Sequence, residues 1–410
     1  MNIICKLFDR LETDNIAHSL GNMMISGVDN FGKRAAYNDL IKYQLLNNRT
    51  LLIFQDEVTL DEHSRLKALI ATYGKKVYDV GMSSSFSKEI DIFSAFSTPY
   101  DKADFIVTML GYLSEVSETV KTRAQGIFYH AIDYFESTGT PYNLEKIADL
   151  DLDELINLIN LSSLPTAEKN KKLRFLSDSS TSSAFVDIEM YLLKMKSWGI
   201  CRVLSGSKNC TDVFSGGNVT VFSGFASEDK AKRELFIKSV LYATRCCIET
   251  LVSSGPISVI FDSTDFMQDD VANSLMEYNA TRNFAVYTIL NDVSSYVNKN
   301  GNDLIDKTKS FLVFTQMSDQ NARFWSGLFG SRDVQERSYS YTRKRGLFSS
   351  VIINSGGVVP TPKRPNMTTT NYHKVNKPIY RPEIFKELRP AEVMCYLREP
   401  LIRRKLRIEV

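Results

Sequence analysis

Two patterns of apolar and polar residues alternate along the chain. Before residue 98, and again after residue 217, short apolar runs such as LLIF at 51–54 and ISVIF at 257–261 precede segments whose apolar residues stand three and four positions apart. The short runs predict strands buried on both faces, and the longer segments predict amphipathic helices. Because a parallel connection needs a crossover helix, this alternation predicts an α/β fold with a mainly parallel sheet.

Between these two parts the strand pattern disappears. Segments such as DFIVTMLGYLSEV and TRAQGIFYHAIDYFEST carry helical spacing throughout, and their aromatic residues share the face of the leucines. We therefore predict one α/β domain made from residues 1–97 and 210–345, with an all-α domain inserted at 98–209. The aromatic residues of the insertion are expected in its core.

The last part of the chain changes again. Beyond Tyr341, Gly, Pro, Thr and basic residues predominate, which predicts a linker with little to bury. The final segment, RPEIFKELRPAEVMCYLREPLIRRKLRIEV, predicts a short helix and one or two strands. Residues 346–410 are thus expected to form a basic linker and a C-terminal segment that returns to the core.

A glycine-bounded turn joins the first predicted strand to the first predicted helix. Gly27, Gly32 and Lys33 have the spacing G-x-x-x-x-G-K of a phosphate-binding loop. In that motif backbone N–H groups hold phosphates, the lysine contacts the β and γ oxygens, and a Ser or Thr hydroxyl binds Mg²⁺. Arg34 occupies the hydroxyl position, and an arginine cannot ligate a cation. The pattern also fits an ordinary turn with a solvated Lys-Arg pair, but the flanking strand and helix favour a phosphate loop without its metal ligand.

Acidic residues follow two of the predicted strands. Asp56 and Glu57 end the second strand and are interpreted either as site residues or as the N-cap of the following helix. Asp262 ends ISVIFD, where P-loop enzymes hold the Mg²⁺ shell, and Ser263 follows it in place of a carboxylate that would polarise water. We expect Arg34 to pair with Asp262 and fill the site; alternatively Arg34 neutralises a bound phosphate in place of the metal.

The order of these segments resembles a known family. ISG-x4-GKR, LLIFQDE, the helical insertion, NVTVFSGF, ISVIFDS, FTQMSDQNARFWSGLFGS and the closing R-P-A-E-V-M-C-Y-L-R-E-P-L-I-R-R-K together resemble the soluble part of type IV secretion coupling proteins, the conjugative TraG/TraD-type P-loop NTPases of the FtsK/HerA superfamily. The resemblance covers nearly the whole chain. It implies a RecA-like core, an all-α domain that helps to select DNA or protein substrates, and ATP with Mg²⁺ as ligands.

The resemblance also implies a role for each candidate residue. These are the phosphate loop (Gly27, Gly32, Lys33), the replaced hydroxyl (Arg34), the metal-side acid (Asp262), the missing catalytic glutamate (Ser263) and the missing nucleotide-sensing glutamine (Asn291). Three departures in one reaction imply a degenerate ATPase, in which ATP binding is weak or lost and Mg²⁺ binds only with nucleotide. We expect a non-hydrolysing accessory or scaffold subunit; the alternative is an active DNA or protein translocation motor with unusual site residues.

Charge and composition add expectations about partners and location. The net charge is only +2, but residues 332–410 contain 17 Lys and Arg against 7 Asp and Glu, which leaves 33 against 41 in the preceding part. The basic end could contact DNA, or its charge could serve solubility alone. Six scattered Cys without a C-x-x-C pair, and no apolar run of about 18 residues, predict a cytoplasmic protein. The resemblance implies homo- or hetero-oligomers with secretion or conjugation components, and contact with the inner membrane only through them.

Overall fold

A nine-stranded sheet forms the centre of the molecule in the computed structural model, which describes residues 22–28, 31–83, 88–113, 116–262, 274–276, 284–294, 297, 303–341, 353–354, 357–358, 368–398 and 401–407. The strand order is β13-β12-β7-β1-β6-β5-β2-β4-β3. The strands are β1 (Met23–Ser26), β2 (Thr50–Val58), β3 (Val77–Gly81), β4 (Val219–Phe225), β5 (Ile257–Asp262), β6 (Phe284–Leu290), β7 (Ser310–Val313), β12 (Glu392–Leu397) and β13 (Ile402–Arg407). From β7 to β3 all neighbours are parallel, whereas β12 and β13 are antiparallel to their neighbours.

The parallel register brings the carboxyl ends of the central strands to one edge. Ser26 at the end of β1 is opposite Leu290 at the end of β6, and Asp262 at the end of β5 is opposite Gln55 on β2. In open α/β sheets, sites form at this edge. The edge therefore collects the turn after β1 and the polar ends of β2, β5 and β6.

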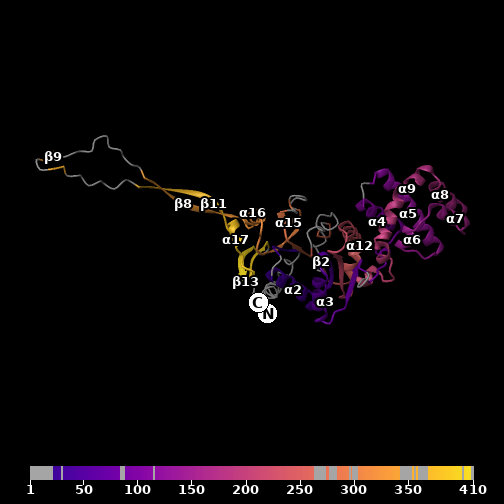
Figure 1. The fold of residues 1–410 in the computed structure, drawn as a ribbon, viewed down its shortest axis with the longest axis horizontal. Helices are drawn as coiled ribbons and strands as arrows, with labels where there is room; N and C mark the ends of the chain where they lie inside the picture. Colours follow the sequence, from indigo (N-terminus) through magenta and orange to yellow (C-terminus); the bar gives the residue numbers. More distant parts are fainter. Residues whose placement is uncertain are drawn as a thin grey trace.

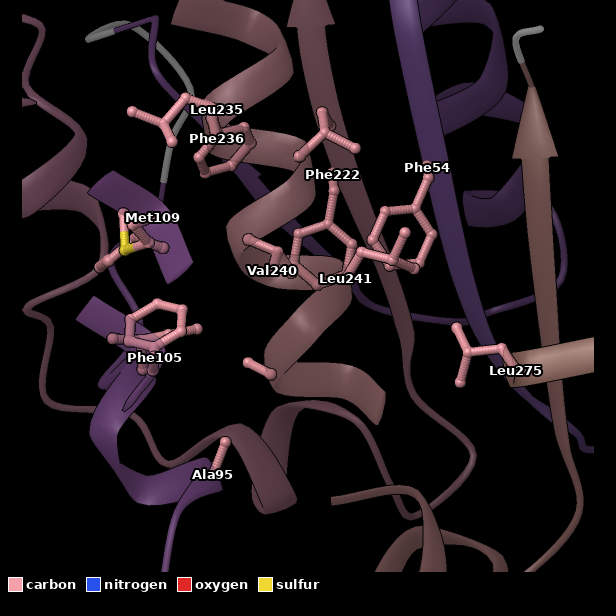
Figure 2. Close-up of a cluster of buried hydrophobic side chains, with 14 of the residues drawn as sticks. Phe54, Ala95, Phe105, Met109, Phe222, Leu235, Phe236, Val240, Leu241 and Leu275 are labelled. Atoms are coloured by element: carbon pink, nitrogen blue, oxygen red, sulfur yellow. The ribbon is translucent and has the colours of Figure 1, made fainter. Parts of the chain in front are cut away.

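Helices cover both faces of the sheet, because alternate residues of each strand point to opposite faces. Leu51 and Ile53 pack with α2 (Phe31–Leu46) and α3 (Leu60–Ala71), whereas Leu52 and Phe54 pack on the other face. On that second face α12 (Lys230–Ser254) lies between the sheet and α4 (Pro99–Leu113). Figure 2 shows Val240 and Leu241 of α12 against the aromatic rings of the strands, which stack at 4.9 Å between Phe54 and Phe222.

The inserted part is helical, as the sequence pattern predicts. Its further elements are the 3₁₀ helix η2 (Ile92–Ala95), α5 (Glu118–Thr138), α6 (Leu144–Ala148), α7 (Leu152–Leu161), α8 (Thr166–Leu176), α9 (Ser179–Ser197), α10 (Ile200–Val203) and α11 (Cys210–Val213). The aromatic residues Phe128, Tyr134 and Phe135 are buried, which confirms their assignment to the core. The prediction of an α/β fold with an inserted all-α part is confirmed.

The C-terminal part contains more strand than its composition predicts. After α15 (Asp303–Lys307) and α16 (Asp319–Leu328), β8 (Ser331–Tyr341) pairs along its whole length with β11 (Thr368–Pro378), and this ribbon extends away from the sheet (Figure 1). Two short strands, β9 (Ile353–Asn354) and β10 (Gly357–Val358), pair with each other. The linker prediction is therefore wrong for residues 368–378.

The chain then returns to the sheet. α17 (Pro382–Lys386) is followed by β12, which pairs antiparallel with β7, and β13 adds the edge strand, so the predicted short helix and final strands are confirmed. None of the helices in the described ranges is long and apolar enough to cross a membrane.

Candidate functional site

Close packing requires a glycine at both glycine positions of the predicted phosphate loop. Gly27 has a φ of +141°, and a Cβ there would lie 2.7 Å from the Cβ of Phe314. A Cβ on Gly32 would lie 2.0 Å from the carbonyl oxygen of Pro390, which belongs to the returning C-terminal segment. Both positions therefore demand glycine for packing, whether or not the turn holds phosphate.

Lys33 is buried at the carboxyl edge and points toward the end of β6. Its Nζ donates hydrogen bonds to the carbonyl oxygens of Gly27 at 3.1 Å and Leu290 at 3.2 Å, and to the side-chain oxygen of Asn291. Lys33 and Asn291, to which the resemblance assigns the phosphate-loop and sensor positions, are thus in direct contact. The two residues come from separate segments of the sequence, and the fold brings their side chains together.

Arg34 lies elsewhere than expected. Its guanidinium is half exposed and lies 3.9 Å from the Glu62 carboxylate on α3. The expected pairing of Arg34 with Asp262 is therefore not formed, because α3 packs beside α2 and presents a carboxylate closer to the arginine. An exposed pair of this kind is weak, so Arg34 does not fill the site.

Asp262 is held by uncharged groups. The side-chain nitrogen of Gln55 donates to its Oδ2 at 3.3 Å, and the Tyr37 hydroxyl faces the same carboxylate from α2 without reaching good hydrogen-bond geometry. Desolvation raises the pKa of the Asp262 carboxyl, while the Gln55 hydrogen bond and the charge of Lys33 act in the opposite direction. Desolvation and the nearby carboxylate raise the pKa of Tyr37 well above its ordinary value, so its phenol stays protonated.

A second buried network lies behind Gln55. His63 Nδ1 lies 3.4 Å from the Gln55 side-chain oxygen and 3.1 Å from the Ser223 hydroxyl, and Nε2 lies 2.8 Å from Asp79. Asp79 also accepts a hydrogen bond from Lys67 at 2.8 Å. After the cost of burial, the hydrogen bonds from His63 and Lys67 lower the pKa of Asp79, which stays ionised.

The acids at the end of β2 form a third cluster. Arg233 of α12 donates to Asp56 at 2.8 Å and to Glu57 at 2.7 Å, and it also donates to the Glu228 carbonyl oxygen at 2.6 Å. Glu57 has a φ of +55°, a left-handed conformation that is unusual for a residue other than glycine. The interpretation of these acids as a helix cap is wrong, because Thr59 caps α3 in a capping box with Glu62.

A cavity of about 400 Å³ lies between α2 and α3, and Gln55, Asp56 and Glu57 line it together with residues of both helices. Six of the residues predicted as site candidates line it, namely Lys33, Arg34, Asp56, Glu57, Asp262 and Asn291. Ser263 lies outside the described residues, and neither Gly27 nor Gly32 is among the cavity's lining residues. Tyr37 and Gln55 also line the cavity and belong to no motif, although Tyr37 stands one helical turn after Lys33 and Gln55 follows the apolar run of β2.

The site fits a nucleotide better than it fits a metal ion. Small-molecule pockets measure about 300–1,000 Å³, and a buried lysine facing the cavity suits phosphate oxygens. Mg²⁺ requires oxygen ligands in near-octahedral geometry. Here the hydroxyl ligand is replaced by Arg34, the Asp262 carboxylate is held by an amide, and the described residues contain no group of three His, Cys, Asp or Glu that could hold a metal. We therefore derive no chemistry through Mg²⁺.

Comparisons with known proteins show which solved structures share this architecture. No family model matches the sequence, and no curated protein matches it significantly. Among solved structures, the bacterial conjugative coupling protein TrwBΔN70 aligns with a TM-score of 0.61 at 13% identity, covering 96% of this chain and 85% of that chain. TrwB in complex with ADP and Mg²⁺ gives a TM-score of 0.62 at 12% identity, with 96% and 86% covered.

A differently named protein also aligns over most of the chain. VirB4 of Thermoanaerobacter pseudethanolicus gives a TM-score of 0.56 at 11% identity, and the alignment covers 95% of this chain and 89% of that chain. Identities this low establish the fold and leave activity to be tested. The chain shares the fold of the TrwB coupling-protein structures, as the resemblance of its segments predicts.

Proposed function

We propose that this protein is a coupling-protein-like subunit of a type IV secretion or conjugation system that binds a nucleotide without hydrolysing it. The observation that supports this proposal best is the cavity itself, in which Lys33 and Asn291 meet while Arg34 points to Glu62. The phosphate-binding lysine is kept in place, whereas the metal side of the site lacks its hydroxyl ligand. The division into residues 1–97 with 210–345, 98–209 and 346–410 is part of this proposal.

Hydrolysis would need groups that position a metal and a water molecule. Neither Arg34 nor the amide-bound Asp262 supplies a free metal ligand, and Ser263 carries no carboxylate. A subunit that keeps the fold and the phosphate side can still respond to nucleotide by changing its contacts with partners. This supports an accessory or scaffold role in DNA or protein transfer.

One observation favours the alternative of an active motor. Glu57 lies on the cavity in a strained backbone conformation, next to the strand that ends in Asp262, and such strain often marks functional positions. A carboxylate there could orient water in place of residue 263. Against this, the Arg233 guanidinium already pairs with Glu57 at 2.7 Å.

Calorimetry and a turnover assay test the proposal. We expect wild-type protein to bind ATP in calorimetry, with Lys33→Ala weakening the affinity by about tenfold or more because the cavity loses its buried ammonium group. The matched control is Lys42→Ala, on the same helix but paired with Asp39 away from the cavity. We expect ATP turnover no faster than that of Lys33→Ala. An ATP turnover rate of about 1 per second that depends on Lys33 and disappears in Glu57→Gln would establish an active motor instead. Absence of ATP binding would leave only the role of a scaffold subunit.

The partner surface is proposed from charge. The basic end of the chain includes the exposed residues Arg404 and Lys405 on β13 and Lys374 on the β8–β11 ribbon. A basic, extended surface of this kind suits DNA or an acidic face of another subunit. Binding of fluorescent DNA that weakens steeply with added salt would support the first partner.

A further inference from the structure

The Gln55 amide lies between a carboxylate and an imidazole. Its nitrogen donates to Asp262 Oδ2 at 3.3 Å, and its oxygen lies 3.4 Å from His63 Nδ1. Only 3% of Gln55 is exposed, so solvent does not compete for either end. The amide oxygen of Gln55 and the carboxylate oxygens of Asp262 are all acceptors and repel one another. An ionised Asp262 therefore fixes the amide with its nitrogen toward the carboxylate.

The surrounding network holds the imidazole in place. Asp79 contacts His63 Nε2 at 2.8 Å, Lys67 neutralises Asp79 at 2.8 Å, and the Ser223 hydroxyl lies 3.1 Å from Nδ1. These residues come from α3, β3 and β4, while Gln55 comes from β2. Since residues of three other elements hold the imidazole that faces this amide, the amide donor is pre-organised toward Asp262.

The other acids of the cavity already have cations. Glu62 pairs with Arg34, and both Asp56 and Glu57 pair with Arg233. Within the ranges that the structure describes, Asp262 has no cationic group within salt-bridge distance and receives the Gln55 amide instead. Lys33 nevertheless acts on this carboxylate through its charge, so a divalent cation would add to positive charge already present.

We propose that Gln55 replaces the metal ion at Asp262: the fixed amide donor takes the position in which P-loop enzymes hold a cation, so this site is independent of divalent metal. Gln55 acts through Asp262 and is a positioning residue. The inference rests on the proposed function only where nucleotide is concerned, because the contact of Gln55 with Asp262 exists without it.

Manganese binding in the absence of nucleotide tests the inference, since electron paramagnetic resonance counts free Mn²⁺ directly. Wild-type protein is expected to bind no Mn²⁺ at Asp262. Gln55→Glu places a second carboxylate about where the amide donor lies. Two facing carboxylates either share a proton or bind a cation, so the titration is done at about pH 8, where loss of that proton is favoured, and we expect Mn²⁺ affinity to rise by about tenfold or more. Gln55→Met is the matched control without a new carboxylate, and Gln55→Glu combined with Asp262→Asn should lose the gain.

Two results would overturn the inference. One is Mn²⁺ binding by the wild type that disappears in Asp262→Asn, a comparison that stands even if no Gln55 variant folds. The other is a folded Gln55→Glu protein, checked by thermal melting, that gains no Mn²⁺. Calorimetry with ATP in Mg²⁺ and in EDTA adds a third comparison: equal affinities within about threefold are expected, and a tenfold preference for Mg²⁺ contradicts the inference. If ATP binds in neither buffer, the proposed function fails while the manganese data still decide the role of Gln55.

Discussion

Arg233 connects the cavity acids to α12, and its removal should be costly. Its side chain is 4% exposed, and it is the described cation that pairs with both Asp56 and Glu57, at 2.8 and 2.7 Å. In Arg233→Met the packing volume is largely kept, but the Asp56 carboxylate, whose Oδ2 already has no partner among the described residues, loses its remaining counter-charge. Removing one member of a buried pair costs about 3–5 kcal/mol in the free energy of unfolding. Glu57 adds little, because 63% of its side chain is exposed.

The pH dependence separates this electrostatic cost from lost packing. Burial raises the pKa of Asp56 above its unfolded value, and Arg233 partly offsets this rise. Without Arg233 the folded pKa climbs further, so the folded state binds the extra proton and regains stability as the pH falls through that pKa. We expect urea denaturation of Arg233→Met to show the full loss at about pH 7 and a smaller loss at about pH 5.

A matched control and a double variant complete the test. Arg202→Met removes an exposed pair with Glu89 at 2.7 Å and should cost about 0–1 kcal/mol at either pH. Asp56→Asn combined with Arg233→Met should recover part of the loss and remove its pH dependence. A loss below about 1 kcal/mol, or a loss that does not change between the two pH values, would refute the assignment of Asp56 as a buried carboxylate that depends on Arg233.

Three further predictions concern the loop and its neighbours. Gly32→Ala should lower the melting temperature strongly, because its Cβ meets the Pro390 carbonyl at 2.0 Å, whereas Gly139→Ala, at a left-handed helix end with open space around it, should cost only about 1 kcal/mol. Arg34→Thr should restore little ATP turnover, because Ser263 still lacks a carboxylate and Gln55 still holds Asp262; turnover that rises about a hundredfold would show that the hydroxyl alone was missing. Thr59→Ala should cost about 1 kcal/mol in thermal unfolding through loss of the α3 capping box, and an unchanged midpoint would contradict that cap.

Much of the fold follows from pattern, because the carboxyl ends of parallel strands must meet at one edge. That rule is enough to place Lys33, Asp262 and Asn291 at one cavity although they are far apart in sequence. It does not predict which neighbour each side chain chooses. Arg34 lies beside Glu62 of α3 because the packing of α2 against α3 sets the distance between the two side chains. No residue spacing in the sequence predicts this distance.

Other contacts leave weaker traces in the sequence. The Thr59-x-x-Glu62 capping box is a motif that can be recognised in the sequence, and it identifies the start of α3. The strand at 368–378 pairs with β8 in a ribbon that extends away from the sheet, so its sequence needs no alternation of apolar and polar residues. The composition of this segment therefore resembles that of a linker. The Gln55–His63 network joins residues of several elements with no periodicity, so only the structure shows it.

The retained motif has a physical explanation that does not require catalysis. Gly27 is fixed by Phe314, Gly32 by the Pro390 carbonyl and Lys33 by the carbonyl oxygens that end β1 and β6, so each contributes to the junction of the loop, the sheet and the returning C-terminal segment. Among the described residues, Arg34 has the Glu62 carboxylate at 3.9 Å, and its side chain is half exposed. A change of side chain at position 34 should therefore cost the fold little, whereas a change at either glycine or at the lysine should disrupt packing. Packing alone can therefore keep the two glycines and the lysine in place while position 34 varies, so this part of the pattern does not by itself indicate catalysis.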